Sequence, residues 1–119
     1  MITAIIYRSN PIYGSGICAV EVSGHAGFGE EGRDIVCASV SVLVITLING
    51  IETFTETPFS CRVDEENGGY VRFELEDGDE DEEDVDPHDS QMLLNVLLMG
   101  LQSIAQQYKG YITIEEKEV

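Results

Sequence analysis

A long stretch without charged side chains, residues 35–51 (IVCASVSVLVITLINGI), places the tightest limit on what this chain can fold into. The stretch is short for a bilayer crossing and contains Ser, Thr, Asn and Gly, so a buried core helix explains it better than a membrane span. Asp34 can cap such a helix and Pro58 can stop it, which predicts a helix over residues 34–54. A helix that is apolar on every side must contact a second helix or another subunit besides a sheet.

Five short runs on either side of this helix are typical of β-strands, because they alternate or are rich in β-branched residues and end in turn residues. Asn67-Gly68 between two of them is a strong hairpin signal. Apolar residues at spacings of three and four predict a second helix over residues 88–108, for which Asp86 and Asp89 compete as the cap. The predicted strands are residues 2–7, 17–22, 59–65, 70–76 and 111–117.

The resulting order, ββαββαβ, in a chain of 119 residues predicts a single domain over residues 1–119. Strands that alternate between apolar and polar residues need cover on one face only. We therefore expect an α+β fold, a two-layer sandwich with both helices packed on one face of a mixed or antiparallel sheet. Two loops stand out: a Gly-rich loop, residues 26–33, which we expect to be flexible, and an acidic loop, residues 76–86.

The charge of the chain limits its partners. Its formal net charge is −17, from 23 Asp and Glu against 6 Lys and Arg. Nucleic-acid binding requires a basic surface, so we expect no direct nucleic-acid contact and favour a basic protein or peptide. Three cysteines without a CxxC pair, and an N-terminus without a basic, cleavable signal, predict a cytoplasmic protein.

The acidic loop holds nine acids in eleven positions and suggests calcium binding through Asp77, Asp79 and Asp81. The pattern does not match an EF-hand, because Glu82 stands where a glycine is needed and His88 where the bidentate glutamate is needed. We therefore expect no metal and no cofactor, and interpret the segment as a solvated loop that repels itself.

Cys37 is the main candidate for a catalytic residue. It falls at the third position of the predicted helix, where backbone N–H groups without intrahelical partners and the helix dipole favour the thiolate. His25, at a strand end, can move the proton while the thiolate attacks a carbonyl, and the same N–H groups can stabilise the oxyanion. Gly27, Gly29 and Gly32 would let the intervening loop close over an extended substrate.

The same residues also have purely structural explanations. A cysteine in an apolar helix is usually a small core residue, and a lone histidine at a strand end is usually hydrogen-bonded at the surface. Asp34 can orient His25 as the third member of a triad or cap the helix, and the cap is favoured because it uses the carboxylate oxygens directly. Cys18 and Cys61 lie in predicted strands, and we interpret both as core residues.

Two segments together match a known pattern: GHA at residues 24–26 and, after the Gly-rich loop, GRDIVCASVS at residues 32–41. They resemble the ribosomal-processing cysteine protease family, Prp. The likeness extends over the whole chain in length, element order and the acidic stretch before the second helix. Ser39 departs from the alanine that is common in the family, and this departure leaves His25 and Cys37 untouched.

The resemblance implies a cytoplasmic, homodimeric cysteine endopeptidase with Cys37 as nucleophile and His25 as proton donor and acceptor. It implies as substrate the N-terminal extension of ribosomal protein twenty-seven of the large subunit, with aromatic residues just before the cut. A basic ribosomal substrate also agrees with the acidic charge. Two alternatives remain: a non-proteolytic thiol or redox protein, and a ribosome-associated binding module in which the acidic loop contacts basic protein.

Overall fold

The computed structural model of this chain describes residues 1–9, 16–24, 35–64, 69–76 and 87–119. Its elements follow the predicted order, and their ends lie close to the predicted ones. In chain order they are β1 (Ile2–Arg8), β2 (Ile17–Ser23), α1 (Ile35–Phe54), β3 (Phe59–Asp64), β4 (Tyr70–Leu75), α2 (Pro87–Gln107) and β5 (Ile112–Glu118).

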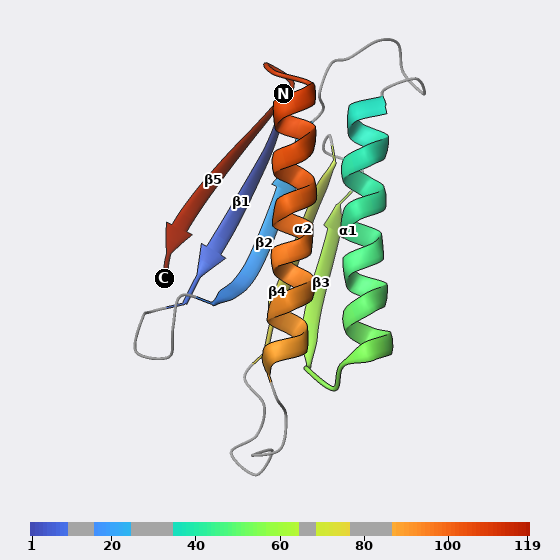
Figure 1. Cartoon of the computed structure of the whole chain (residues 1–119), viewed down its shortest axis with the longest axis vertical. Helices are drawn as coiled ribbons and strands as arrows, with labels where there is room; N and C mark the ends of the chain where they lie inside the picture. The colour runs from blue at the N-terminus through green and yellow to red at the C-terminus, as the bar shows by residue number, and fades with distance from the viewer. Residues whose placement is uncertain (10–15, 25–34, 65–68, 77–86) are drawn as a thin grey trace.

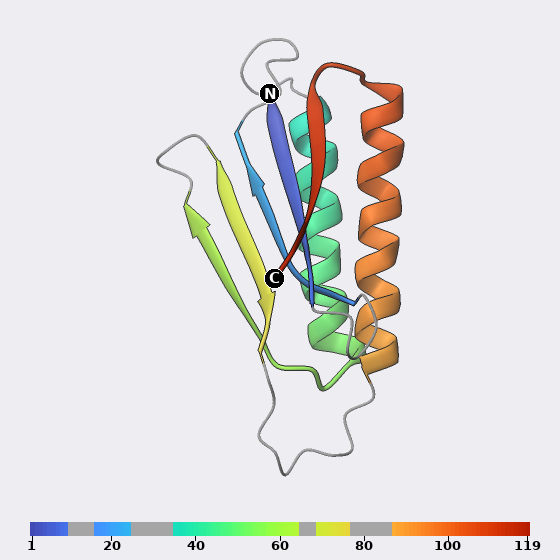
Figure 2. The same ribbon diagram turned by 90° about the vertical axis from the view of Figure 1, so that its left-hand side faces the viewer.

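The strands form one mixed sheet in the order β3-β4-β2-β1-β5. β1 and β5 pair in parallel, and the other neighbours pair antiparallel. Both helices lie side by side over one face of this sheet (Figure 1), and the edge-on view separates a helix layer from a sheet layer (Figure 2). The predicted α+β sandwich is therefore confirmed.

The core lies between these two layers. α1 contributes apolar side chains at spacings of three and four, and α2 does the same from the other helix, so each helix buries one stripe against the sheet. By length and composition alone α1 could span a bilayer, with a mean hydropathy of 2.1, but its buried stripe belongs to the sandwich core. The buried residues of α1 are Val36, Val40, Val44, Leu47 and Ile51.

The two helices approach closely because each presents a glycine to a leucine of the other. A Cβ built on Gly100 of α2 would lie 2.9 Å from Cδ1 of Leu43, whereas a Cβ built on Gly50 of α1 would lie 3.5 Å from Cδ1 of Leu93. A methyl group on Gly100 would therefore fit only if the Leu43 side chain moved, whereas a methyl group on Gly50 would make an ordinary van der Waals contact with Leu93.

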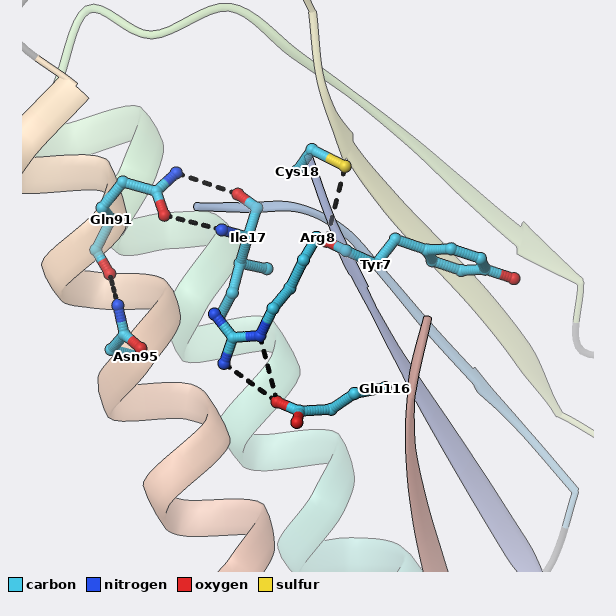
Figure 3. A network of polar contacts seen from close by, with 7 residues as sticks. All are labelled: Tyr7, Arg8, Ile17, Cys18, Gln91, Asn95 and Glu116. Atoms are coloured by element: carbon cyan, nitrogen blue, oxygen red, sulfur yellow. Dashed lines mark hydrogen bonds and ion pairs between the residues drawn. The ribbon is translucent and has the colours of Figure 1, made fainter. Parts of the chain in front are cut away.

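A side-chain amide holds the start of β2 to α2 (Figure 3). Oε1 of Gln91 accepts a hydrogen bond from the Ile17 N–H at 2.8 Å, and its Nε2 donates to the Ile17 carbonyl at 2.9 Å. Both backbone polar groups of a fully buried residue are thereby satisfied from the helix layer. The two hydrogen bonds fix the start of β2 relative to the first turns of α2, which sets the position of β2 under the helices.

The prediction that Cys61 and Cys18 are core residues is wrong for Cys61 and only partly right for Cys18. Cys61 is exposed, and Val63 on the same face is 59% exposed, because β3 is an edge strand that the helices leave uncovered. Cys18 is half-buried, and its thiol donates to the Tyr7 carbonyl at 3.4 Å (Figure 3). Alternation identified the faces of the strands correctly but not how far the helix layer extends over them.

The two helix glycines give a stability prediction. Gly50→Ala should stabilise the fold by about 0.5–1 kcal/mol, because alanine is the better helix former and its methyl group fits against Leu93. Gly100→Ala gains the same helix propensity but forces Leu43 to move, so we expect no gain or a loss of about 1 kcal/mol. Urea unfolding followed by circular dichroism measures both. Equal stabilisation by the two substitutions would show that the glycine–leucine contact does not set the helix spacing.

Candidate active site

A groove of about 350 Å³ opens between α1 and the sheet. The strand side includes Val22 of β2, Val71 of β4 and the exposed Val63 of β3. The helix side contributes Cys37, Val40, Ser41, Val44, Ile45 and Ile48. The lining is largely apolar, and its volume is near the small end of the ~300–1,000 Å³ typical of ligand sites.

Cys37 lies in the wall of this groove. It is half-buried and is the third residue of α1, as predicted. The first-turn N–H groups of a helix have no intrahelical acceptor, and the dipole adds roughly half a positive charge at this end. Both effects stabilise a thiolate and an oxyanion that forms beside it, so the position of Cys37 suits a nucleophile.

The other predicted site residues, His25, Asp34, Gly27, Gly29 and Gly32, lie outside the described residues. The structure does describe the two ends that flank their segment. β2 ends at Ser23 and is followed by Gly24, and α1 begins at Ile35, two residues before Cys37. Gly24, on the sheet side, and Cys37, on the helix side, both line the groove, so described residues on either side of this segment reach the same groove.

Two glycines with positive φ form the sheet end of the groove. Gly24 has φ +90° and Gly69 has φ +80°. The Gly24 N–H donates to the Gly69 carbonyl at 3.0 Å, and both residues line the groove. Gly69 is a site residue that was not predicted from the sequence, although it follows the Asn67-Gly68 turn signal and precedes a strand, a position where positive φ is common.

A polar network on the other face of the sheet holds these strand ends together. Oη of Tyr70 donates to Oε2 of Glu21 at 2.9 Å, and Nη1 of Arg72 lies 3.1 Å from the same oxygen. The Arg72 guanidinium also lies 4.8 Å from the centre of the Tyr7 ring. The hydrogen bond to the Glu21 carboxylate raises the pKa of Tyr70 above its ordinary value, because the carboxylate favours the protonated phenol that donates to it. β4 is thus fixed to β2 beside the groove.

Cys37 and Cys61 have different surroundings, so we expect their thiols to react at different pH. Local desolvation raises the pKa of the Cys61 thiol, even though the residue as a whole is exposed. Cys37 instead sits at a helix N-terminus, so we expect it to alkylate with a midpoint below the ordinary value of about 8.5. A thiol with a raised pKa becomes reactive only at higher pH, and therefore Cys61 should label above that value.

Iodoacetamide labelling between pH 6 and 9.5, read by peptide mass spectrometry, tests this order. Cys61→Ser provides the control, since it removes the slow site and should leave the Cys37 profile unchanged. Identical pH profiles for the two thiols would contradict activation of Cys37 by the helix.

A thiol in the first turn of a helix, set in the wall of an apolar groove, is the arrangement expected of an enzyme with a cysteine nucleophile. Comparison with known proteins makes the class specific. Residues 1–113 match the family model of Cysteine protease Prp, and this chain belongs to that family. It is a cysteine peptidase, a hydrolase, which confirms the predicted enzyme class over the non-proteolytic alternatives.

Related proteins agree in sequence and in fold. The ribosomal processing cysteine protease Prp of Bacillus subtilis strain 168 is 33% identical over 118 residues, which are 96% of each chain. Crystal structures of Prp from S. aureus, an essential ribosomal processing protease, are 29% identical and match 98% of this chain and 100% of theirs. The structure with a covalently linked product peptide has a TM-score of 0.80, and that with a substrate peptide 0.76.

Proposed function

We propose that this chain is a cytoplasmic ribosomal-processing endopeptidase that removes the N-terminal extension of ribosomal protein twenty-seven of the large subunit. The observation that carries the proposal is Cys37, placed at the N-terminus of α1 and in the wall of the apolar groove. The names of the relatives, and the peptides bound in related structures, support a polypeptide substrate of ribosomal origin.

In the proposed reaction the Cys37 thiolate attacks the carbonyl carbon of the scissile peptide bond, after His25 has taken the thiol proton. The resulting oxyanion is stabilised by N–H groups of the first turn of α1, and His25 then protonates the leaving amine as the C–N bond breaks. Water hydrolyses the thioester and restores the thiol. Asp34 serves as the helix cap or as an orienting group for His25.

Substrate recognition would combine two surfaces of different character. The groove lining favours apolar side chains, in agreement with aromatic residues just before the cut. The net charge of −17 would attract the basic body of a ribosomal protein. Gly27, Gly29 and Gly32 are proposed to let their loop close over the bound extension.

Removal of the nucleophile tests the proposal directly. Cys37→Ala should abolish cleavage and leave the melting temperature nearly unchanged, because alanine is an excellent helix former and the site is only half-buried. Cys61→Ala, a matched substitution at an exposed thiol, should keep full activity. The measurement is mass spectrometry of the ribosomal substrate after incubation with the pure protein. Cleavage by Cys37→Ala at the native rate would rule out the mechanism.

We also propose that the chain forms a homodimer through the outer face of its helix layer. Residues 35–51 and 90–108 carry no charged side chain in a chain of net charge −17, so two copies can approach there without like-charge repulsion. A pair of helices of this length covers about 600 Å² per copy, or roughly 1,200 Å² in total, the lower limit of a specific interface. Within residues 35–51 and 90–108, the large exposed apolar residues outside the groove lining are Ile35, Val42, Met92, Val96 and Met99.

A charge on this face should separate the two copies. Val96→Glu places a carboxylate in the interface on a side chain that is already 53% exposed, so the monomer should fold while the dimer dissociates. Val119→Glu, the same change at a 68% exposed position in the last residue, is the control and should stay dimeric. Light scattering coupled to size exclusion measures the mass. A monomeric native chain, or a dimeric Val96→Glu, would contradict this interface.

A further inference from the structure

We propose that Gly24 is a positioning residue for the peptidase reaction, because the first peptide of β1 leaves no room for a side chain there and fixes the direction in which the chain leaves β2 for His25. The inference rests on the proposed function, in which His25 transfers the proton. It assigns to Gly24 a role in catalysis that is separate from its role in folding.

The backbone conformation of Gly24 is one that requires glycine. Its φ of +90° lies in a region that residues with a side chain rarely adopt. Its N–H donates at 3.0 Å to the carbonyl of Gly69, which has φ +80°, so the two glycines hold each other in these conformations. Both line the groove that also contains Cys37. The conformation of Gly24 is thus set inside the wall of the site.

The first peptide of the chain leaves no room for a side chain at Gly24. A Cβ built on Gly24 would overlap the carbonyl oxygen of Met1. That carbonyl cannot easily withdraw, because the Ile2 N–H of the same peptide donates to the Tyr111 carbonyl at 3.0 Å. The C=O and N–H of a planar trans peptide point in opposite directions. The Ile2 N–H is therefore held by Tyr111, next to β5, while the Met1 C=O faces Gly24. Ile2 itself is 2% exposed and belongs to the core.

These contacts decide which part of the molecule would move if a side chain were added. Moving the Met1 peptide would break the Ile2–Tyr111 hydrogen bond and disturb a buried residue, whereas Gly24 is exposed at the end of its strand. The displacement therefore falls on Gly24 and on its hydrogen bond to Gly69, at the point from which the chain continues to His25. Misplacement of a catalytic group by about 1 Å can lower the rate by roughly a hundredfold.

The experiment compares Gly24→Ala with Gly110→Ala. Gly110 has nearly the same φ, +88°, but a Cβ built there meets nothing within 4 Å, and the residue does not line the groove. Both variants carry the same positive-φ strain, and Gly24→Ala adds the overlap with the Met1 carbonyl. Both should therefore melt at a lower temperature than the native chain, Gly24→Ala by more, and kcat is measured well below either melting temperature. Only Gly24→Ala should lose activity: kcat falls by about a hundredfold while KM stays within about threefold.

The labelling rate of Cys37 is measured in parallel and should match that of the native chain in both variants, since the thiol is positioned by α1. Equal kcat values for Gly24→Ala and Gly110→Ala would overturn the inference and leave the proposed function intact. If Gly24→Ala does not fold, Gly69→Ala is used in its place, because it strains the residue whose carbonyl accepts the Gly24 hydrogen bond. A native kcat in Gly69→Ala would then overturn the inference. If neither the native chain nor Gly110→Ala cuts the substrate, the proposed function is wrong, and so is the inference that rests on it.

Discussion

The burial of one stripe of α1 against the sheet is the contact from which the site follows. With 3.6 residues per turn, the burial of Val36, Val40 and Val44 fixes the rotation of the helix about its axis. The neighbouring flank must then turn toward the open side of the sheet, and this flank carries Cys37, Ser41, Ile45 and Ile48. Cys37, the proposed nucleophile, is therefore placed by core packing in the first turn of α1.

The groove exists because the sheet is wider than the helix layer. β3 is the edge strand next to β4, and its apolar face is left partly uncovered at Val63 and Cys61. An exposed apolar side chain that would be a liability at an ordinary sheet edge, Val63, here forms part of the groove lining. The feature that made the core prediction for Cys61 wrong is thus the feature that opens the space beside Cys37.

Local patterns predicted the fold well because each element carries its own signal. The uncharged run gave α1, the three-and-four spacing gave α2, and alternation gave β3 and β4, so the order and the two layers followed. The place of Cys37 at the third helical position followed from the same reasoning. The parallel pairing of β1 with β5, the contact of Gly24 with Gly69, and the block at Met1 did not, since they join residues far apart in the chain and leave no local pattern. The family motif predicted His25 and Cys37 as a pair, which spacing alone left open.

Charge is distributed in the molecule in a way that matters for the proposed substrate. The helix layer over residues 35–51 and 90–108 is uncharged, while the acids are concentrated in the strands, their ends and the loops between elements. Attraction of a basic body acts over about 8 Å at physiological ionic strength, whereas apolar contact in the groove acts only at van der Waals distance. On the proposed function, salt would weaken the capture of the substrate far more than it weakens the choice of side chains before the cut. On the proposed function the two contributions to recognition are therefore separable by experiment, because they depend on different forces.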